Sequence, residues 1–168
     1  MIGSSLITGG SAQKKRASAP VLNMRSQATG SLSVSLSGVP DGARMTSGSA
    51  AQNSLDLGSV SYAGHPMSAN VDVERSAGRF VVSTRFAMVV NGDSHIPAAT
   101  VLAALAIPEP VFIVRIDGVK LGPTPQLIQG QARIGVTTQH RLEIEVPTSV
   151  TEKNSQLHNS IVFQVIAN

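Results

Sequence analysis

The chain has no cysteine and no tryptophan, and aromatic residues make up only 3% of its 168 positions. Without cysteine there is no disulfide framework, no thiolate metal site and no cysteine nucleophile. With so few aromatic side chains, a platform that stacks on sugar rings or on nucleic-acid bases is not expected. No run of about 20 apolar residues occurs either, so we expect no membrane span.

Charged side chains are also scarce. Asp, Glu, Lys and Arg together make up 14% of the residues, against about 25% in ordinary globular domains. The net charge of +3 arises in residues 1–50, which hold Lys14, Lys15, Arg16, Arg25 and Arg44 against Asp41, while the remainder is nearly neutral. A nucleic-acid-binding domain carries its basic excess on the folded face, so no nucleic-acid partner is expected.

The composition that remains is rich in Ser, Thr, Gly, Ala and Val, with 42% hydrophobic residues. This is enough for a sizeable core, and low charge combined with small residues is typical of secreted or surface β-proteins. We therefore expect an extracellular or cell-surface location. The length predicts one domain with an appendage.

Residues 1–29 are interpreted as an N-terminal extension, and residues 30–168 as the folded domain. The apolar run within residues 1–10 is too short for a signal peptide, and the Lys14–Arg16 cluster is interpreted as a solvated linker. The extension does carry short apolar segments that need a strand partner. Their side chains are the first group of candidate assembly residues: Leu6, Ile7, Val21, Leu22 and Met24.

The strongest strand signal is Arg79–Asn91, thirteen residues without Gly or Pro and rich in β-branched and aromatic side chains. Alternate positions place six side chains on one apolar face, and the mixed second face consists of Val81, Ser83, Arg85, Ala87 and Val89. Such a long strand either spans a whole sandwich or bends and changes sheets midway. We expect part of its length, or its sheet, to be completed by the extended N-terminal segment of this chain or of another copy. The receiving candidates are Phe80, Val82, Phe86 and Met88.

Other strands follow from alternation and from turn chemistry. Ser31–Ser37 alternates perfectly between apolar and serine positions, and Asp117-Gly118 is the preferred type I′ hairpin dipeptide. Residues 96–107 have helix-forming composition but lie between strands, so a strand is favoured over a helix. Further strands are predicted at 55–62, 70–75, 111–116, 119–121, 132–136, 140–146 and 160–166, with loops at 44–53 and 147–159. The pattern predicts an all-β, antiparallel β-sandwich, an Ig-like Greek key or a jelly roll.

The sequence contains no motif that indicates a catalytic or phosphate-binding site. The glycine-rich loops that bind phosphate and the serine nucleophile elbow are absent. Asp93-Ser94-His95 has the residue types of a hydrolytic triad, but neighbours in one turn cannot form its relay, because triad members come from separate segments. Glu143 and Glu145 lie on one strand face and resemble a carboxylate pair, but Arg141 shares that face, which indicates a solvated edge. We therefore expect no catalytic residue, no cofactor and no metal.

Two stretches carry a resemblance. Leu55-Asp-Leu-Gly-Ser-Val, followed by strands, and the closing Asn159-Ser-Ile-Val-Phe-Gln-Val-Ile-Ala-Asn resemble secreted bacterial β-sandwich surface proteins of the pilus-subunit and spore-coat kind. The resemblance spans residues 55–168 and implies an extracellular filament or coat component. The missing cysteines depart from many chaperone–usher pilins, which puts that assembly route in doubt.

The functional prediction is a non-enzymatic structural subunit of an extracellular filament, pilus or coat. Its partners would be other copies of itself, joined through β-strand addition by the N-terminal extension, as in donor-strand complementation. The alternative is a secreted carbohydrate- or protein-binding β-sandwich module.

Overall fold

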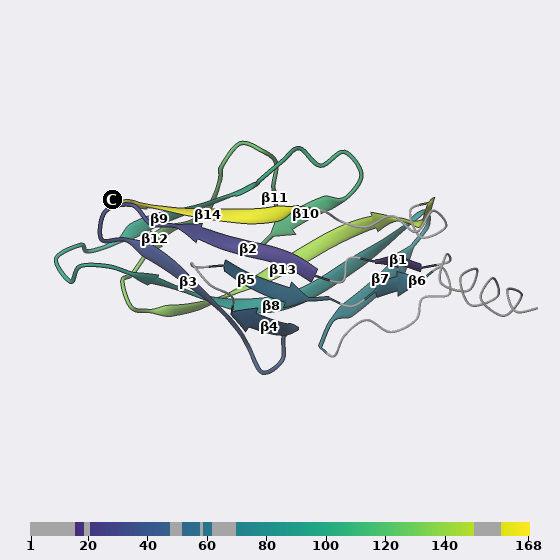
Figure 1. The fold of residues 1–168 in the computed structure, drawn as a ribbon, viewed down its shortest axis with the longest axis horizontal. Helices are drawn as coiled ribbons and strands as arrows, with labels where there is room; N and C mark the ends of the chain where they lie inside the picture. Colours follow the sequence, from purple (N-terminus) through teal and green to yellow (C-terminus); the bar gives the residue numbers. More distant parts are fainter. Residues whose placement is uncertain (1–15, 19–20, 48–51, 58, 62–69, 150–158) are drawn as a thin grey trace, which may run out of the picture.

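The computed structural model describes residues 16–18, 21–47, 52–57, 59–61, 70–149 and 159–168. These residues are mostly strands, with almost no helix, which confirms the all-β prediction (Figure 1). The strands are β1 (Arg16–Ser18), β2 (Val21–Gln27), β3 (Ser33–Gly38), β4 (Arg44–Ser47), β5 (Gln52–Asp56), β6 (Ser59–Ser61), β7 (Asp72–Ser76), β8 (Arg79–Asn91), β9 (Ala99–Leu105), β10 (Ile113–Ile116), β11 (Val119–Lys120), β12 (Gln126–Ala132), β13 (Thr137–Pro147) and β14 (Ser160–Ala167).

Two six-stranded, mainly antiparallel sheets contain most of these strands. The first, called here the long-strand sheet, has the order β11-β10-β13-β8-β3, with β7 also paired to β8. The second, called the terminal-strand sheet, has the order β12-β9-β14-β2-β5-β4 and so places the C-terminal strand beside a strand from the N-terminal region. Figure 1 shows β14 in yellow beside β2 in purple. β1 and β6 form a separate two-stranded pair.

The strand predicted at Arg79–Asn91 is β8, with the same bounds. Its apolar face is buried as expected: Phe80, Val82, Thr84, Phe86, Met88 and Val90 are all at most 4% exposed. One edge of β8 pairs with β13 along Arg79–Val89. The other edge is shared, because β7 covers residues 79–83 and β3 covers residues 86–91.

Among the described residues, no N-terminal segment of this chain therefore completes this strand or its sheet, and completion by another copy stays a prediction. β3 and β7 occupy the edge that we had expected an N-terminal segment to cover. Residues 21–27 form β2, which lies in the terminal-strand sheet between β14 and β5. Strand alternation specifies which side chains face the core but not which strand is the neighbour, so the sequence could not assign β2 to a sheet.

One hydrophobic core joins the two sheets. Phe86 of β8 meets Phe163 of β14 edge-to-face, with ring centroids 6.1 Å apart. Such aromatic pairs contribute beyond their buried area. Three of the four phenylalanines are among the largest fully buried side chains, so the few aromatic residues are used to pack the core.

Several finer predictions are confirmed. Leu32, Val34 and Leu36 are buried, as the serine alternation required. Residues 99–105 form a strand and not a helix. Asp117 and Gly118 have φ values of 50° and 82°, as a type I′ turn demands.

Three local predictions are wrong. Residues 44–53 were expected to be a loop, yet they contain β4 and the start of β5. The expected strand at 55–62 is divided, because β5 ends at Asp56 and β6 begins at Ser59, in another sheet. The strand expected at 132–136 lies earlier, at β12, where two register shifts hide the alternation. Polar sequences become strands here because sheet neighbours override weak local propensity.

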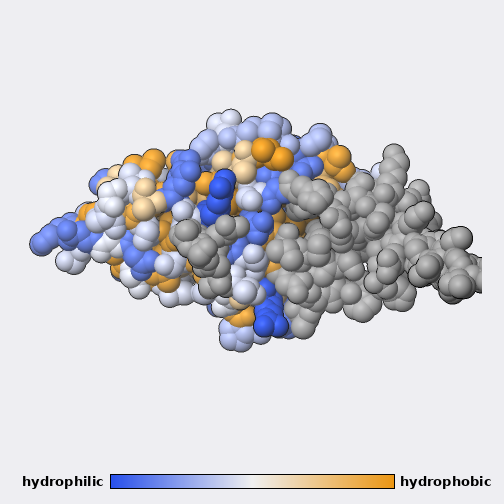
Figure 2. Space-filling view, viewed as in Figure 1, coloured by the Kyte–Doolittle hydropathy of each residue, from blue (hydrophilic) through white to orange (hydrophobic). Residues whose placement is uncertain are grey.

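Hydrophobic residues on the described part of the surface in Figure 2 form separate spots among hydrophilic ones. Among the described residues no helix is long and apolar enough to cross a membrane.

Candidate functional site

The sequence-predicted assembly residues fall into three groups. Leu6 and Ile7 lie outside the described residues. Val21 opens β2, and for this residue only the backbone pairing with Asp56 is described. The other six are core residues, each at most 1% exposed: Leu22, Met24, Phe80, Val82, Phe86 and Met88.

β2 is brought into an unusual position. It runs parallel to β14 over Asn23–Gln27, whereas the other pairs between named strands of the described chain are antiparallel. On its other side it pairs with β5, and the Ser54 hydroxyl donates to Asn23 Oδ1 at 2.9 Å. β2 lies near the start of the described chain and β14 at its end, so these two parallel neighbours are far apart in the sequence.

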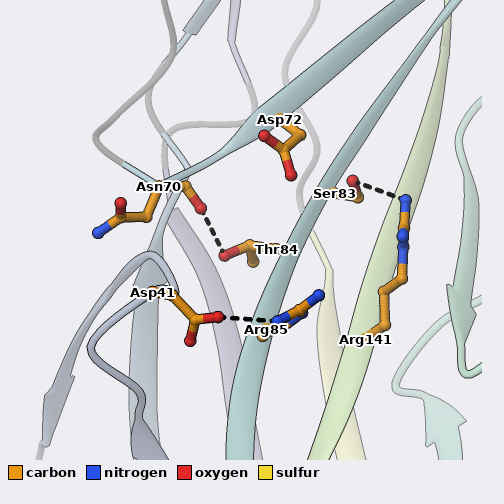
Figure 3. A pocket seen from close by; sticks show the side chains of 7 residues that line it. All are labelled: Asp41, Asn70, Asp72, Ser83, Thr84, Arg85 and Arg141. Carbon is orange, nitrogen blue, oxygen red and sulfur yellow. Dashed lines mark hydrogen bonds and ion pairs between the residues drawn. The ribbon is translucent and has the colours of Figure 1, made fainter.

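A polar pocket of about 250 Å³ lies at the junction on β8 where β7 ends its pairing and β3 begins. Four chain segments supply its walls: the turn after β3, the start of β7, the middle of β8, and β13. Figure 3 shows the seven lining residues, which are Asp41, Asn70, Asp72, Ser83, Thr84, Arg85 and Arg141. Sequence reasoning missed this pocket because its residues come together only through strand register.

At the junction, the turn after β3 and the segment before β7 are both held close to β8. The Thr84 hydroxyl accepts a hydrogen bond from Ala43 N at 2.7 Å and donates to Asn70 O at 3.1 Å. Gly42 lies so close to β8 that a Cβ there would be 2.2 Å from the Arg85 carbonyl oxygen. Thr84 thus joins the two segments that share the edge of β8.

The pocket contains an unfavourable charge arrangement. Arg85 and Arg141 are directly opposite each other on β8 and β13. Like charges at such positions destabilise a sheet. Asp41 accepts from Arg85 Nη1 at 2.8 Å, and Arg141 donates to Ser83 at 3.1 Å with Glu143 3.5 Å from its Nε. Asp72, across β8, has no hydrogen bond or ion pair among the described residues and is exposed.

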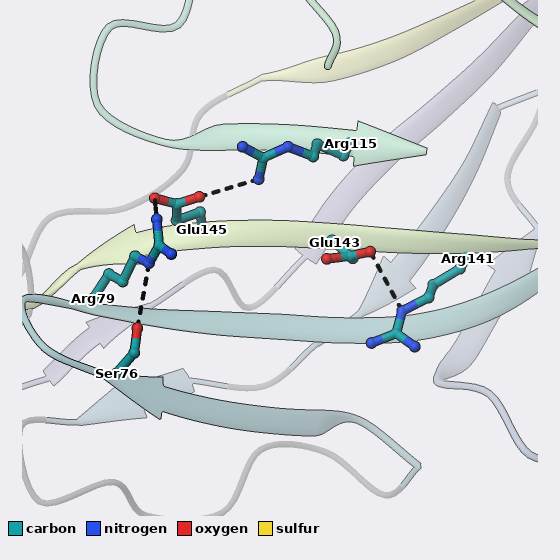
Figure 4. Close-up of polar contacts among 6 residues, drawn as sticks. All are labelled: Ser76, Arg79, Arg115, Arg141, Glu143 and Glu145. Atoms are coloured by element: carbon teal, nitrogen blue, oxygen red, sulfur yellow. Dashed lines mark hydrogen bonds and ion pairs between the residues drawn. The ribbon is translucent and has the colours of Figure 1, made fainter. Parts of the chain in front are cut away.

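A second polar cluster spans three strands of the same outer face (Figure 4). Glu145 of β13 accepts from Arg79 of β8 at 2.9 Å and from Arg115 of β10 at 3.0 Å. The hydrogen bonds from Arg115 and then Arg79 lower the pKa of Glu145 below its ordinary value. Glu143 and Glu145 are thus paired with different arginines. The expected solvated edge is wrong, because β13 lies between β10 and β8 and the Glu145 side chain is only 13% exposed.

A third cluster has an Asp–His–Thr order that the sequence did not reveal. His140 Nδ1 is 2.6 Å from Asp117 Oδ2, and its Nε2 is 2.8 Å from the Thr138 hydroxyl. His140 is only 6% exposed and lies against Phe86. Asp117 also accepts from Arg141 N at 2.8 Å. The β10–β11 turn places Asp117 there, and the cluster fastens that turn to β13.

The expected turn role of Asp93-Ser94-His95 agrees with the geometry. Asp93 Oδ1 accepts from the backbone N of His95 at 3.0 Å, and all three side chains are exposed. Among the described residues no group of three His, Asp or Glu side chains is placed to hold a metal ion.

The fold and these clusters define an all-β protein with two mainly antiparallel sheets. No protein-family model matches the chain, and no curated protein matches it.

Proposed function

We propose that this chain is a non-enzymatic structural subunit of an extracellular filament, pilus or coat, and that copies assemble by exchanging the N-terminal strand β2. The proposal treats the two sheets as an antiparallel β-sandwich, Ig-like or jelly-roll in type, with residues before 30 as the exchangeable segment. The observation that carries it is the parallel placement of β2 between β14 and β5.

Two features of β2 favour exchange. The strand is joined to the rest of the domain on its C-terminal side by the short turn Thr29–Leu32, whose Gly30 has a φ of 61°. Its inward side chains Leu22 and Met24 are fully buried, so whichever copy supplies β2 completes the core. Exchange of an identical element between copies is a low-cost route to assembly, because the contacts in the closed and exchanged forms are the same.

Cysteine cross-linking tests this directly, since the chain has no cysteine of its own. Asn23 and Ser54 are opposite each other on β2 and β5, at a Cα separation suited to a disulfide. Copies carrying Asn23→Cys are refolded together with copies carrying Ser54→Cys and then oxidised. Exchange predicts a disulfide-linked dimer from this mixture, and a covalent ladder from the double variant.

The matched control replaces Asn23→Cys by Ser35→Cys, which lies on the exposed side of β3 in the other sheet. That mixture should not cross-link. Negative-stain microscopy of the unmodified full chain should show fibres. An intrachain disulfide alone in the double variant, together with monodisperse particles, would refute strand exchange.

A second candidate function is a secreted carbohydrate- or protein-binding module. The observation that favours it is the polar pocket at the β3–β7 junction, whose seven lining residues include two arginines and two aspartates. A filament subunit does not require such a pocket.

A further inference from the structure

The arginine pair in the polar pocket calls for a physical reason. Arg85 and Arg141 occupy directly opposite positions on neighbouring strands, an arrangement that costs stability. Natural proteins depart from such local rules mainly at functional or strained sites. Asp41 and Glu143 each offset one of the two charges, and an anionic group between the guanidiniums would be shared by both arginines.

Both guanidinium groups have N–H donors that remain available to an anionic ligand. Arg85 uses Nη1 for Asp41, and Arg141 uses Nη2 for Ser83 and Nε, at 3.5 Å, for Glu143. Each guanidinium carries five N–H donors. Both side chains are about half exposed, at 56% and 54%. A planar carboxylate matches the fork of donors that arginine offers.

The other polar side chains that line the pocket are suited to hydroxyl groups on the same ligand. Asp72 is an acceptor without a partner among the described residues. Ser83 and the Asn70 side chain each contain both a donor and an acceptor, with Asn70 Nδ2 also directed to Pro40 O at 3.2 Å. Hydroxyls donate and accept, so they can use all three groups. An ammonium only donates and would leave the donors of Ser83 and Asn70 unmatched.

The volume limits the size of the ligand. At about 250 Å³ the pocket is smaller than the roughly 300–1,000 Å³ of sites for drug-sized molecules. One sugar ring is the appropriate scale. We propose that the junction pocket binds a small hydroxylated carboxylate of the sugar-acid class, its carboxylate between Arg85 and Arg141 and its hydroxyls on Asp72, Ser83 and Asn70.

The test is an amide chemical-shift titration of the full chain with sodium D-glucuronate at millimolar concentrations. Shifts should be confined to the pocket residues. D-glucose, which lacks the carboxylate, should bind at least about tenfold more weakly, and acetate, which lacks the hydroxyls, should also bind about tenfold more weakly. L-serine tests the ammonium alternative and should bind more weakly than glucuronate.

Arg141→Gln should weaken glucuronate binding by about tenfold or more, because a charge-assisted hydrogen-bonded pair is lost. Asp72→Asn should reduce the preference for glucuronate over acetate while leaving acetate binding unchanged. Lys120→Gln, at the exposed end of β11, is the matched charge-removing control and should bind as the unmodified protein does.

The proposal is overturned if glucuronate causes no shifts at the pocket, or if glucose or serine binds as tightly. Unchanged glucuronate affinity in Arg141→Gln overturns it as well. Asp72→Asn provides an independent check should Arg141→Gln fail to fold, since the Asp72 side chain is exposed and has no hydrogen bond or ion pair among the described residues.

Discussion

At the scale of single residues, the outer face of the long-strand sheet is organised by its arginines. Glu145 lies between Arg79 and Arg115 and is 13% exposed. Arg85 and Arg141, by contrast, are opposite each other without a shared carboxylate. The same face thus holds one carboxylate shared by two arginines and two opposed arginines with separate carboxylate partners, and only the second arrangement borders a pocket.

Glu145→Gln should lower the free energy of unfolding by about 1 kcal/mol at neutral pH, because the carboxylate between two arginines is lost. The pKa of Glu145 is lowered in the folded state, so its contribution is present above the unfolded value of about 4.3 and is lost as pH falls through the folded value. Urea denaturation at several pH values should show the difference between variant and parent shrinking in acid. Glu74→Gln, on an exposed strand without an ion pair among the described residues, should show no such trend.

At the scale of elements, the junction between β3 and β7 depends on a close approach of backbone to backbone. Gly42 follows β3 and packs directly on β8, where Thr84 bonds to both flanking segments. Where two short strands share the edge of a long one, the backbone between them must be covered, because unpaired strand edges can pair with other chains.

Gly42→Ala should destabilise the protein by about 1–3 kcal/mol, as overpacking does in a dense interior. The added Cβ would be 2.2 Å from a backbone oxygen and 2.7 Å from Val39 Cγ2. Relieving the first contact requires a shift of the β8 backbone, which costs free energy of folding. Gly122→Ala is the control, since a Cβ there meets nothing within 4 Å. Equal thermal midpoints for the two variants would contradict this account of the junction.

At the scale of the whole molecule, β2 is part of the core and not a loose appendage in this structure. Met24 is 0% exposed, and β2 holds β14 and β5 together. Removing its packing should therefore weaken the global fold and not only its N-terminal end.

Met24→Ala is expected to cost about 2–5 kcal/mol in the free energy of unfolding, the range for a buried methionine. The loss should shift the whole cooperative transition, followed by circular dichroism, without a separate early phase. Val73→Ala, on the exposed strand β7 with the side chain 38% exposed, should change stability by no more than about 0.5 kcal/mol. A Met24→Ala effect as small as that of Val73→Ala would show that β2 contributes little to the core.

The sequence by itself determined the strands with clear alternation and the side chains that they bury. Arg79–Asn91, which is β8, and Ser31–Ser37, observed as β3 at Ser33–Gly38, follow from a period of two residues, since that period places side chains on opposite faces of a strand. Strands with register shifts or polar composition, such as β12 and β4, were missed because their order comes from neighbouring strands.

Only the tertiary structure decided which strands are neighbours. It placed β2 beside β14, assembled the pocket from residues 41 to 141, and set Arg85 opposite Arg141. The physical reason is that alternation fixes the face of a side chain, whereas pairing and register depend on the whole sheet. Contacts across strands distant in sequence therefore leave no local signal, and the candidate site consists of such contacts.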